Sequence, residues 1–182
     1  MKFLKNILLI VVTIFIYSCE NNQFQFREQY DPQQNLARER PLIADYLLSA
    51  PYDSLYRIHD PQGVVIIVQE EGTGVRPKPN TIVYTNYVGK LLDGTVFDTN
   101  IRAVAEEHGL DTEGKSFTPF SFPIDQQGRA IAGFSMGFKH LRSGSKAVII
   151  IPSPHAYQNQ AQGERLPPNS ILVFEVDFLG ID

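Results

Sequence analysis

The chain reads Gly89-Lys-Leu-Leu-Asp-Gly-Thr-Val-Phe-Asp98 near its middle, and this segment is the strongest indication of its fold. Asp-Gly at positions 93 and 94 is a strong hairpin signal, because tight hairpin turns need positive φ angles that glycine adopts readily. Residues 81–92, which lead into this turn, are a strand candidate. We therefore expect an antiparallel sheet built around this hairpin.

Apolar runs on both sides of the hairpin predict the other strands. Residues 64–68 and 146–151 are almost continuously β-branched or apolar, and residues 118–122 alternate around two phenylalanines. Residues 171–179 place Leu172, Phe174, Val176 and Phe178 on one face of a last strand. The strands thus account for most of the second half of the chain.

One helix is predicted late in the sequence. Ile131, Phe134, Phe138 and Leu141 recur at helical spacing, and Gly144 fits the end of such a helix. A set of strands with one helix covering one face is an α+β arrangement. Residues 99–118 form an insertion between two motifs, in which 101–110 could make one or two helical turns.

The N-terminus has the features of a secretory signal. Two lysines precede an apolar run of about 11 residues, which is too short to span a membrane, where roughly 20 are needed. Cys19 is the only cysteine and stands where a bacterial lipoprotein signal carries its lipid-modified cysteine, although Tyr17 departs from the small residue usual there. An ordinary signal with an incidental cysteine, or an uncleaved anchor, is the alternative.

We expect three parts: a signal peptide (1–18), a tether with a short helical segment (19–63) and a folded domain (64–182). Residues 20–40, rich in Asn, Gln and charge, are typical of a spacer. Pro41 fits the first turn of a helix that runs to about Ser49 and ends before Pro51. We expect this helix to pack only weakly on the domain.

The composition excludes several classes of function. Without Lys2 and Lys5, the 164 residues from Cys19 onward carry 14 basic and 20 acidic residues, a formal charge of −6. No basic cluster is present, which argues against nucleic-acid binding. Four histidines lie far apart in the sequence without zinc-type spacing, so no zinc site is expected. The lone cysteine, taken up by lipid, leaves no disulfide.

Four short motifs occur in a characteristic order along the chain. They are 89–98, Pro119-Phe-Ser-Phe122, Ala130-Ile-Ala-Gly-Phe134, and Ala156-Tyr157 with Leu166-Pro-Pro-Asn-Ser-Ile-Leu-Val-Phe174. This order resembles the FK506-binding-protein (FKBP) family of peptidyl-prolyl isomerases. The resemblance implies a curved, mainly antiparallel sheet wrapped around one short α-helix, with an apolar pocket between them. Such a site needs no nucleophile, metal or cofactor.

The resemblance also implies a role for each pocket residue. Tyr157 would donate its hydroxyl to a substrate carbonyl, Asp98 would organise the polar edge, and Phe97 would form a catalytic wall. The backbone N–H of Ile131 would bond a ligand carbonyl. The remaining substrate-binding residues would be Tyr87, Phe120, Ala130, Ile131, Phe134, Leu166 and Phe174. Taken singly, the aromatic residues could equally be core residues, and Asp98 could cap a turn.

Three positions depart from the family pattern. Phe134 stands where tryptophan is most common, and Gln158 follows Tyr157 where glycine is usual. The arginine that often pairs with the acidic residue has no clear counterpart, and Arg102 is the candidate substitute. The long insertion should also enlarge one wall of the pocket.

These features predict a prolyl isomerase that assists the folding of exported proteins. It would be lipid-anchored in a bacterial cell envelope, in the outer membrane, facing periplasm or surface. Its partners would be proline-containing polypeptides and the membrane, with FK506-type macrolides as inhibitors. The alternatives are a weakly catalytic or non-catalytic chaperone module, suggested by the three departures, and an envelope-complex component that uses residues 20–60 for recognition.

Overall fold

A computed structural model describes residues 30–126 and 128–182. The predicted signal peptide and Cys19 lie outside the described residues. Within the described ranges, no helix is long and apolar enough to cross a membrane.

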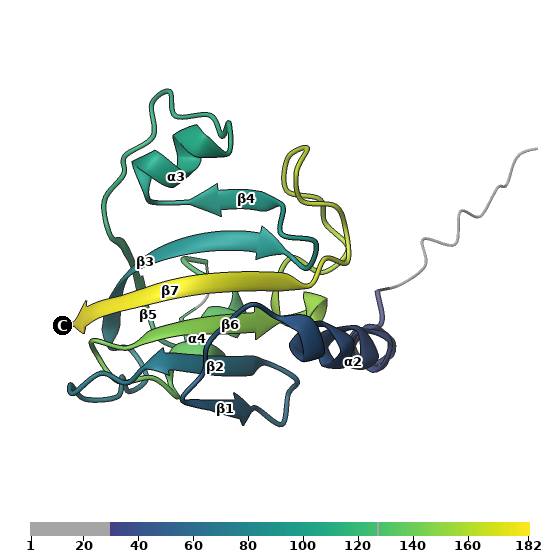
Figure 1. Cartoon of the computed structure of the whole chain (residues 1–182), viewed down its shortest axis with the longest axis horizontal. Helices are drawn as coiled ribbons and strands as arrows, with labels where there is room; N and C mark the ends of the chain where they lie inside the picture. The colour runs from purple at the N-terminus through teal and green to yellow at the C-terminus, as the bar shows by residue number, and fades with distance from the viewer. Residues whose placement is uncertain (1–29, 127) are drawn as a thin grey trace, which may run out of the picture.

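Seven antiparallel strands form one sheet. The hydrogen-bonded order is β1-β2-β6-β7-β3-β4, and β5 pairs with β3 beside β4. Figure 1 shows these strands as one twisted layer. Their bounds are β1 Tyr56–His59, β2 Val65–Glu70, β3 Ile82–Leu91, β4 Val96–Thr99, β5 Phe120–Pro123, β6 Lys146–Ile151 and β7 Leu172–Ile181. The predicted strands are all present. Strand β1 was not predicted, and it lies before residue 64, where the folded domain was expected to begin.

The hairpin between β3 and β4 forms as its sequence predicts. The Leu91 N–H donates to the Thr95 carbonyl at 2.9 Å, and the Gly94 N–H donates to the Leu91 carbonyl at 3.0 Å. Gly94 has φ +88°, which residues with a Cβ adopt only at a cost. This turn places Phe97 and Asp98 of β4 beside Gly89 of β3.

The sheet wraps around the short helix as predicted, and its other face is covered by the N-terminal helix, which was expected to pack only weakly. Helix α4 (Ala132–Phe138) packs on one face, and α2 (Pro32–Ser49) packs on the other. In β6, Ala147, Ile149 and Ile151 belong to the α4 side. Val148 and Ile150 belong to the α2 side. The continuous apolar runs of β2 and β6 therefore reflect burial on both faces.

Helix α2 begins nine residues before the predicted start at Pro41. The Asp31 carboxylate accepts hydrogen bonds from the N–H groups of Gln33 (2.9 Å) and Gln34 (3.1 Å), and Pro32 occupies the first turn. This is a favourable N-terminal cap followed by proline at a position that needs no N–H. Pro41 lies inside the helix and is exposed. Residues 32–40 are thus helical and not part of a spacer.

Three shorter elements complete the fold. Helix α3 (Arg102–Glu107) lies in the insertion, stops at Gly109 with φ +60°, and projects beyond β4 in Figure 1. The turn η1 (Ser153–His155) follows β6. Helix α4 ends at Phe138 with Lys139 as its cap, so Gly144 belongs to the turn before β6 and does not end the helix.

Candidate active site

A cavity of about 170 Å³ lies between the sheet, the N-terminal end of α4 and the loop after β6. It has roughly ten times the space that one water molecule needs, and it is smaller than the cavities that hold drug-sized ligands. It therefore suits a group the size of one amino-acid side chain. Its lining residues are Tyr87, Phe97, Asp98, Phe120, Arg129, Ala130, Ile131, Phe134, Tyr157 and Phe174.

The floor of the cavity is Phe134, the third residue of α4. Its ring is 3% exposed and meets Phe174 edge to face, with 4.6 Å between the ring centroids. The centroids of Phe122 and Tyr87 lie 5.5 and 6.2 Å from it. Phenylalanine at this position therefore sits in a closed aromatic cluster and presents an apolar surface to the pocket.

Aromatic rings from four strands form the walls. Phe97 of β4 meets Phe174 of β7 at 5.6 Å, and Tyr87 of β3 meets Phe120 of β5 at 5.8 Å, both edge to face. Gly89 lies beneath two of these rings: a Cβ there would come within 2.8 Å of Phe97 Cζ and 2.9 Å of Phe174 Cε1. The glycine of the hairpin motif thus allows both walls to approach the strand.

The polar edge centres on Asp98. Its Oδ2 accepts a 2.6 Å hydrogen bond from the Tyr87 hydroxyl, and its Oδ1 lies 3.3 Å from Lys115 Nζ. Burial, together with the hydrogen bond to Asp98 and the charge of that carboxylate, raises the pKa of Tyr87 well above its usual value. Tyr87 is therefore a neutral donor that orients Asp98.

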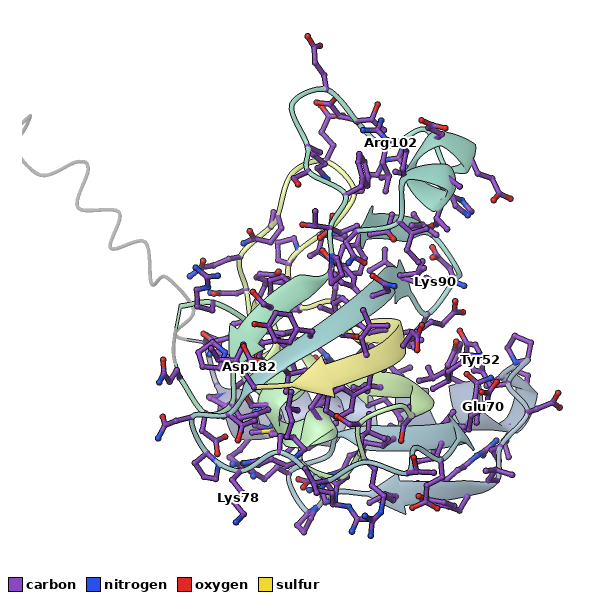
Figure 2. All side chains as sticks on the ribbon, turned by 90° about the vertical axis from the view of Figure 1, so that its left-hand side faces the viewer. Tyr52, Glu70, Lys78, Lys90, Arg102 and Asp182 are labelled. Atoms are coloured by element: carbon purple, nitrogen blue, oxygen red, sulfur yellow. The ribbon has the colours of Figure 1, made fainter. Side chains whose placement is uncertain are left out.

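Arg102 does not take the role suggested for it. Its guanidinium lies 3.7 Å from Glu106 and 4.4 Å from the Phe117 ring centroid. Figure 2 shows Arg102 in the projecting insertion. The cation that pairs with Asp98 is Lys115, which comes from the same insertion as Arg102 and lies 17 residues after Asp98. Sequence reasoning missed Lys115 because a long loop carries no periodicity that would indicate its path.

Tyr157 lies at the rim and is 36% exposed. Its hydroxyl makes no hydrogen bond to any residue in the described ranges. Partial burial, and to a lesser degree the Asp98 carboxylate, raise the pKa of Tyr157. The hydroxyl is therefore protonated at neutral pH and available to donate to a bound group.

The loop keeps a left-handed backbone at the residue after Tyr157. Gln158 has φ +56°, a conformation that glycine adopts at lower cost. Its N–H donates to the Ser153 carbonyl at 3.1 Å, and its carbonyl accepts from the Asn169 N–H at 2.7 Å. Glutamine thus keeps the conformation that glycine would favour, held by two backbone hydrogen bonds.

The start of α4 supplies a second donor. Ile131 is the N-cap of α4 with extended backbone, and its N–H donates to no acceptor among the described residues. Ala130 and Arg129 flank it at the cavity. Arg129 was not among the predicted site residues, and no carboxylate in residues 30–126 and 128–182 lies within 4 Å of its guanidinium.

Nine of the predicted site residues line this one cavity, whereas Leu166 does not. Leu166 is 1% exposed and belongs to the core on the α4 side of the sheet. Its N-terminal neighbour Arg165 donates to the carbonyls of His108 and Gly109 at 2.9 Å each, and so ties the loop before β7 to the insertion. Within the described residues, no group of three or more His, Cys, Asp or Glu side chains could hold a metal.

Comparisons with known proteins agree with this geometry. A family model described as "FKBP-type peptidyl-prolyl cis-trans isomerase" matches residues 74–179. The chain is 34% identical over 119 residues to a probable FKBP-type peptidyl-prolyl cis-trans isomerase FkpA of Neisseria meningitidis serogroup B, covering 65% of this chain and 38% of that protein. Identity to FkpA of Escherichia coli strain K12 is 36%, with the same coverage. The chain spans about two fifths of the length of these curated relatives.

Solved structures give the same result. A peptidyl-prolyl cis-trans isomerase of Pseudomonas syringae pv. tomato aligns with a TM-score of 0.60 and 26% identity, covering 84% of this chain and 96% of that one. FkpA of Escherichia coli aligns with a TM-score of 0.58 and 29% identity, covering 83% and 62%.

Proposed function

Because the chain belongs to the FKBP-type peptidyl-prolyl cis-trans isomerase family, we propose that it accelerates rotation about X–Pro bonds in proline-containing polypeptides. The observation that carries the proposal is the aromatic cavity between α4 and the sheet. At its edge lie two donors, the Tyr157 hydroxyl and the Ile131 N–H, that have no acceptor among the described residues. No bond is made or broken in this reaction, so a site without nucleophile or metal is sufficient.

The energetics suit such a cavity. Amide resonance gives a rotation barrier of about 18–20 kcal/mol, although trans is favoured over cis by only about 0.5–1 kcal/mol. The planar amide is more charge-separated than the twisted one. An apolar, water-poor pocket therefore destabilises the ground state relative to the transition state. A differential effect of about 5 kcal/mol would accelerate rotation by three to four orders of magnitude.

The residues then take distinct roles. The proline ring would sit on Phe134 between Phe97 and Phe174, where the cavity has room for a group of that size. The hydroxyl of Tyr157 and the N–H of Ile131 would hold carbonyl oxygens of the bound segment and so fix the rest of the backbone while one amide rotates. Asp98 would organise the edge without exchanging protons, because its Oδ2 already accepts the Tyr87 hydrogen bond.

A protease-coupled or NMR-exchange assay of the full chain on short X–Pro peptides tests the proposal. Phe97→Ala should lower kcat/KM tenfold or more, because it removes a wall, while Tyr157→Phe and Asp98→Ala should each lower it about two- to fivefold. An FK506-type macrolide should compete with the peptide. Uncatalysed rates with the wild-type chain would contradict the proposal, and wild-type rates in all three variants would contradict the site assignment.

The same assay separates turnover from binding alone. The binding-only alternative rested partly on Phe134 and Gln158. Phe134 is buried in an aromatic cluster, and Gln158 keeps the left-handed backbone that glycine would favour. Neither position gives a structural reason for lost turnover, so we place isomerisation first. Peptide affinity without rate enhancement would reverse that order.

We further propose that Cys19 carries lipid and tethers the domain to a bacterial envelope membrane, where the clients would be exported polypeptides. The support is the N-terminal sequence alone: a basic start, a short apolar run and Ser18-Cys19. Acyl chains would anchor the chain at about 0.8 kcal/mol per buried methylene. Labelled palmitate should enter the wild-type chain but not Cys19→Ser, and equal labelling would rule out this attachment.

A further inference from the structure

Glu39 of α2 is a buried carboxylate that the proposed reaction does not use. It is 1% exposed and lies outside the segment that the family model matches, residues 74–179. A carboxylate is costly to bury unless hydrogen bonds replace its contacts with water. Its partners are therefore informative about what α2 does.

Glu39 binds Ser153, the first residue of η1. Oε2 accepts from the Ser153 N–H at 2.7 Å, and Oε1 accepts from the Ser153 hydroxyl at 2.6 Å. The Tyr30 hydroxyl lies 3.1 Å from the same Ser153 oxygen. Because the serine has a single hydroxyl proton and gives it to Glu39, Tyr30 is the donor in that contact. Arg38 Nη2 lies 3.2 Å from Oε1 and completes the set.

Ser153 in turn holds the loop that carries Tyr157. Its carbonyl accepts from the Ala156 N–H at 3.0 Å and from the Gln158 N–H at 3.1 Å. These two residues flank Tyr157 on either side. A continuous series of hydrogen bonds thus connects Glu39 with the Tyr157 loop. It runs from Glu39 to the Ser153 N–H and from the Ser153 carbonyl to the two residues that flank Tyr157.

Packing fixes α2 at this place. Leu36, almost one turn before Glu39, is 7% exposed. A Cβ built on Gly63 would lie 2.9 Å from Leu36 Cδ1 and 3.6 Å from Pro152 Cγ. Leu36 of α2 and Pro152, the residue before Ser153, thus both lie next to Gly63, and α2 contacts η1.

We propose that Glu39 is a positioning residue for the Tyr157 loop, acting through Ser153, so that a helix outside the matched domain determines how well the rim of the site is ordered. The proposal rests on the function proposed above. When only part of the population has the loop in place, apparent affinity falls by that fraction, because the bound segment must order the loop itself. Loss of Glu39 should then raise KM more than it lowers kcat.

Hydrogen exchange of the full chain, in mild non-ionic detergent, measures the loop directly. In Glu39→Ala, the amides of Ala156 and Gln158 should exchange roughly 10- to 100-fold faster, because a charge-assisted hydrogen bond is lost and a buried N–H is left unpaired. Ile43→Ala is the matched control: Ile43 is on the same buried side of α2 but packs in the cluster on the sheet. It should lower the unfolding midpoint and leave loop exchange within about threefold of wild type.

Glu39→Gln provides the rescue. The amide oxygen can accept from the Ser153 N–H, and the amide nitrogen can donate to a Ser153 hydroxyl that turns toward Tyr30. Loop exchange should return to within about threefold of wild type. Equal acceleration in the Ile43→Ala control, or none in Glu39→Ala, would overturn the proposal.

The kinetic arm uses the same variants on an X–Pro peptide. Glu39→Ala should raise KM three- to tenfold with kcat within twofold, and Glu39→Gln should restore KM. A fall in kcat at constant KM would refute the positioning role. If the wild-type chain does not isomerise peptides, the proposed function fails, while the exchange arm still decides whether Glu39 orders the loop.

If Glu39→Ala does not fold, Ser153→Ala replaces it, because it removes the hydroxyl and keeps the backbone N–H. It should accelerate exchange at Ala156 and Gln158 about three- to tenfold, and unchanged exchange would count against the series of hydrogen bonds.

Discussion

Gly133→Ala should destabilise the protein, although alanine normally stabilises a helix. Gly133 is the second residue of α4, and a Cβ built there would lie 2.2 Å from Ile151 Cγ2, 2.9 Å from Cδ1 and 3.0 Å from Cγ1. Carbon atoms pack favourably at about 3.5–4.0 Å. Ile151 is fully buried in β6, so it has little space to retreat.

The magnitude follows from two opposing effects. Replacing glycine by alanine inside a helix gains about 1 kcal/mol. Overpacking a closed core costs about 1–3 kcal/mol, and this overlap, which exceeds 1 Å at a β-branched side chain, belongs at the upper end. The net loss is then about 2 kcal/mol, or roughly 4–8 °C in unfolding midpoint for a chain of this size. Because Phe134 follows directly on α4, the pocket floor should move as well, and kcat/KM should fall.

Denaturant unfolding, with the isomerase assay alongside, measures both effects. Gly180→Ala in β7 is the control, because nothing lies within 4 Å of a Cβ there, and it should be neutral or slightly stabilising. Adding Ile151→Ala to Gly133→Ala should cost less than the sum of the two single changes, since the new methyl group occupies part of the vacated space. A Gly133→Ala variant as stable as wild type, or additive behaviour in the double variant, would refute the close-approach argument.

Further substitutions test the polar edge and the loop of the site. Lys115→Ala should lower kcat/KM by no more than about threefold at low salt and less at high salt, since its pair with Asp98 is exposed; in the same assay Arg102→Ala should have no effect. Gln158→Gly should raise the free energy of unfolding by up to about 1 kcal/mol in denaturant titrations, because it relieves a left-handed backbone; a loss of stability would contradict this. The raised pKa of Tyr87 means that the unfolded chain loses this proton first, so stability should fall as pH rises above about 10. Urea titrations at pH 8 and 11 measure this loss in the free energy of unfolding, which should be smaller in Tyr87→Phe than in wild type. An equal loss in both proteins would show that Tyr87 is not its source.

Local sequence signals predicted the sheet because each depends on neighbours in the chain. The Asp93-Gly94 turn needs only its own backbone preference, and Phe174 and Phe178 of β7 needed only period-two spacing to be placed on one face. The start of α2 also carries a local signal, because Asp31-Pro32 is a capping sequence, although the helix was predicted to begin only at Pro41. The missed β1 is short and mostly exposed, so its burial pattern carries little signal.

The pocket was predictable to the extent that strands and helix fix side-chain direction. Tyr87, Phe97 and Phe134 lie on regular elements, and the resemblance of the motif order to the FKBP family predicted them as pocket residues; all three line the cavity. Leu166 lies in a long loop without periodicity, and the direction of its side chain followed from no local rule. It points into the core.

The amino-acid sequence by itself determined the strands and the pocket-floor helix, because short-range backbone preferences and apolar periodicity specify these. The aromatic lining of the cavity was predicted from the resemblance of the motif order to the FKBP family. Only the tertiary structure decided which polar groups meet. Lys115 reaches Asp98 across 17 residues, and Glu39 reaches Ser153 across 114. Such pairs depend on how loops close and on which sheet face a helix covers, and no local pattern records either.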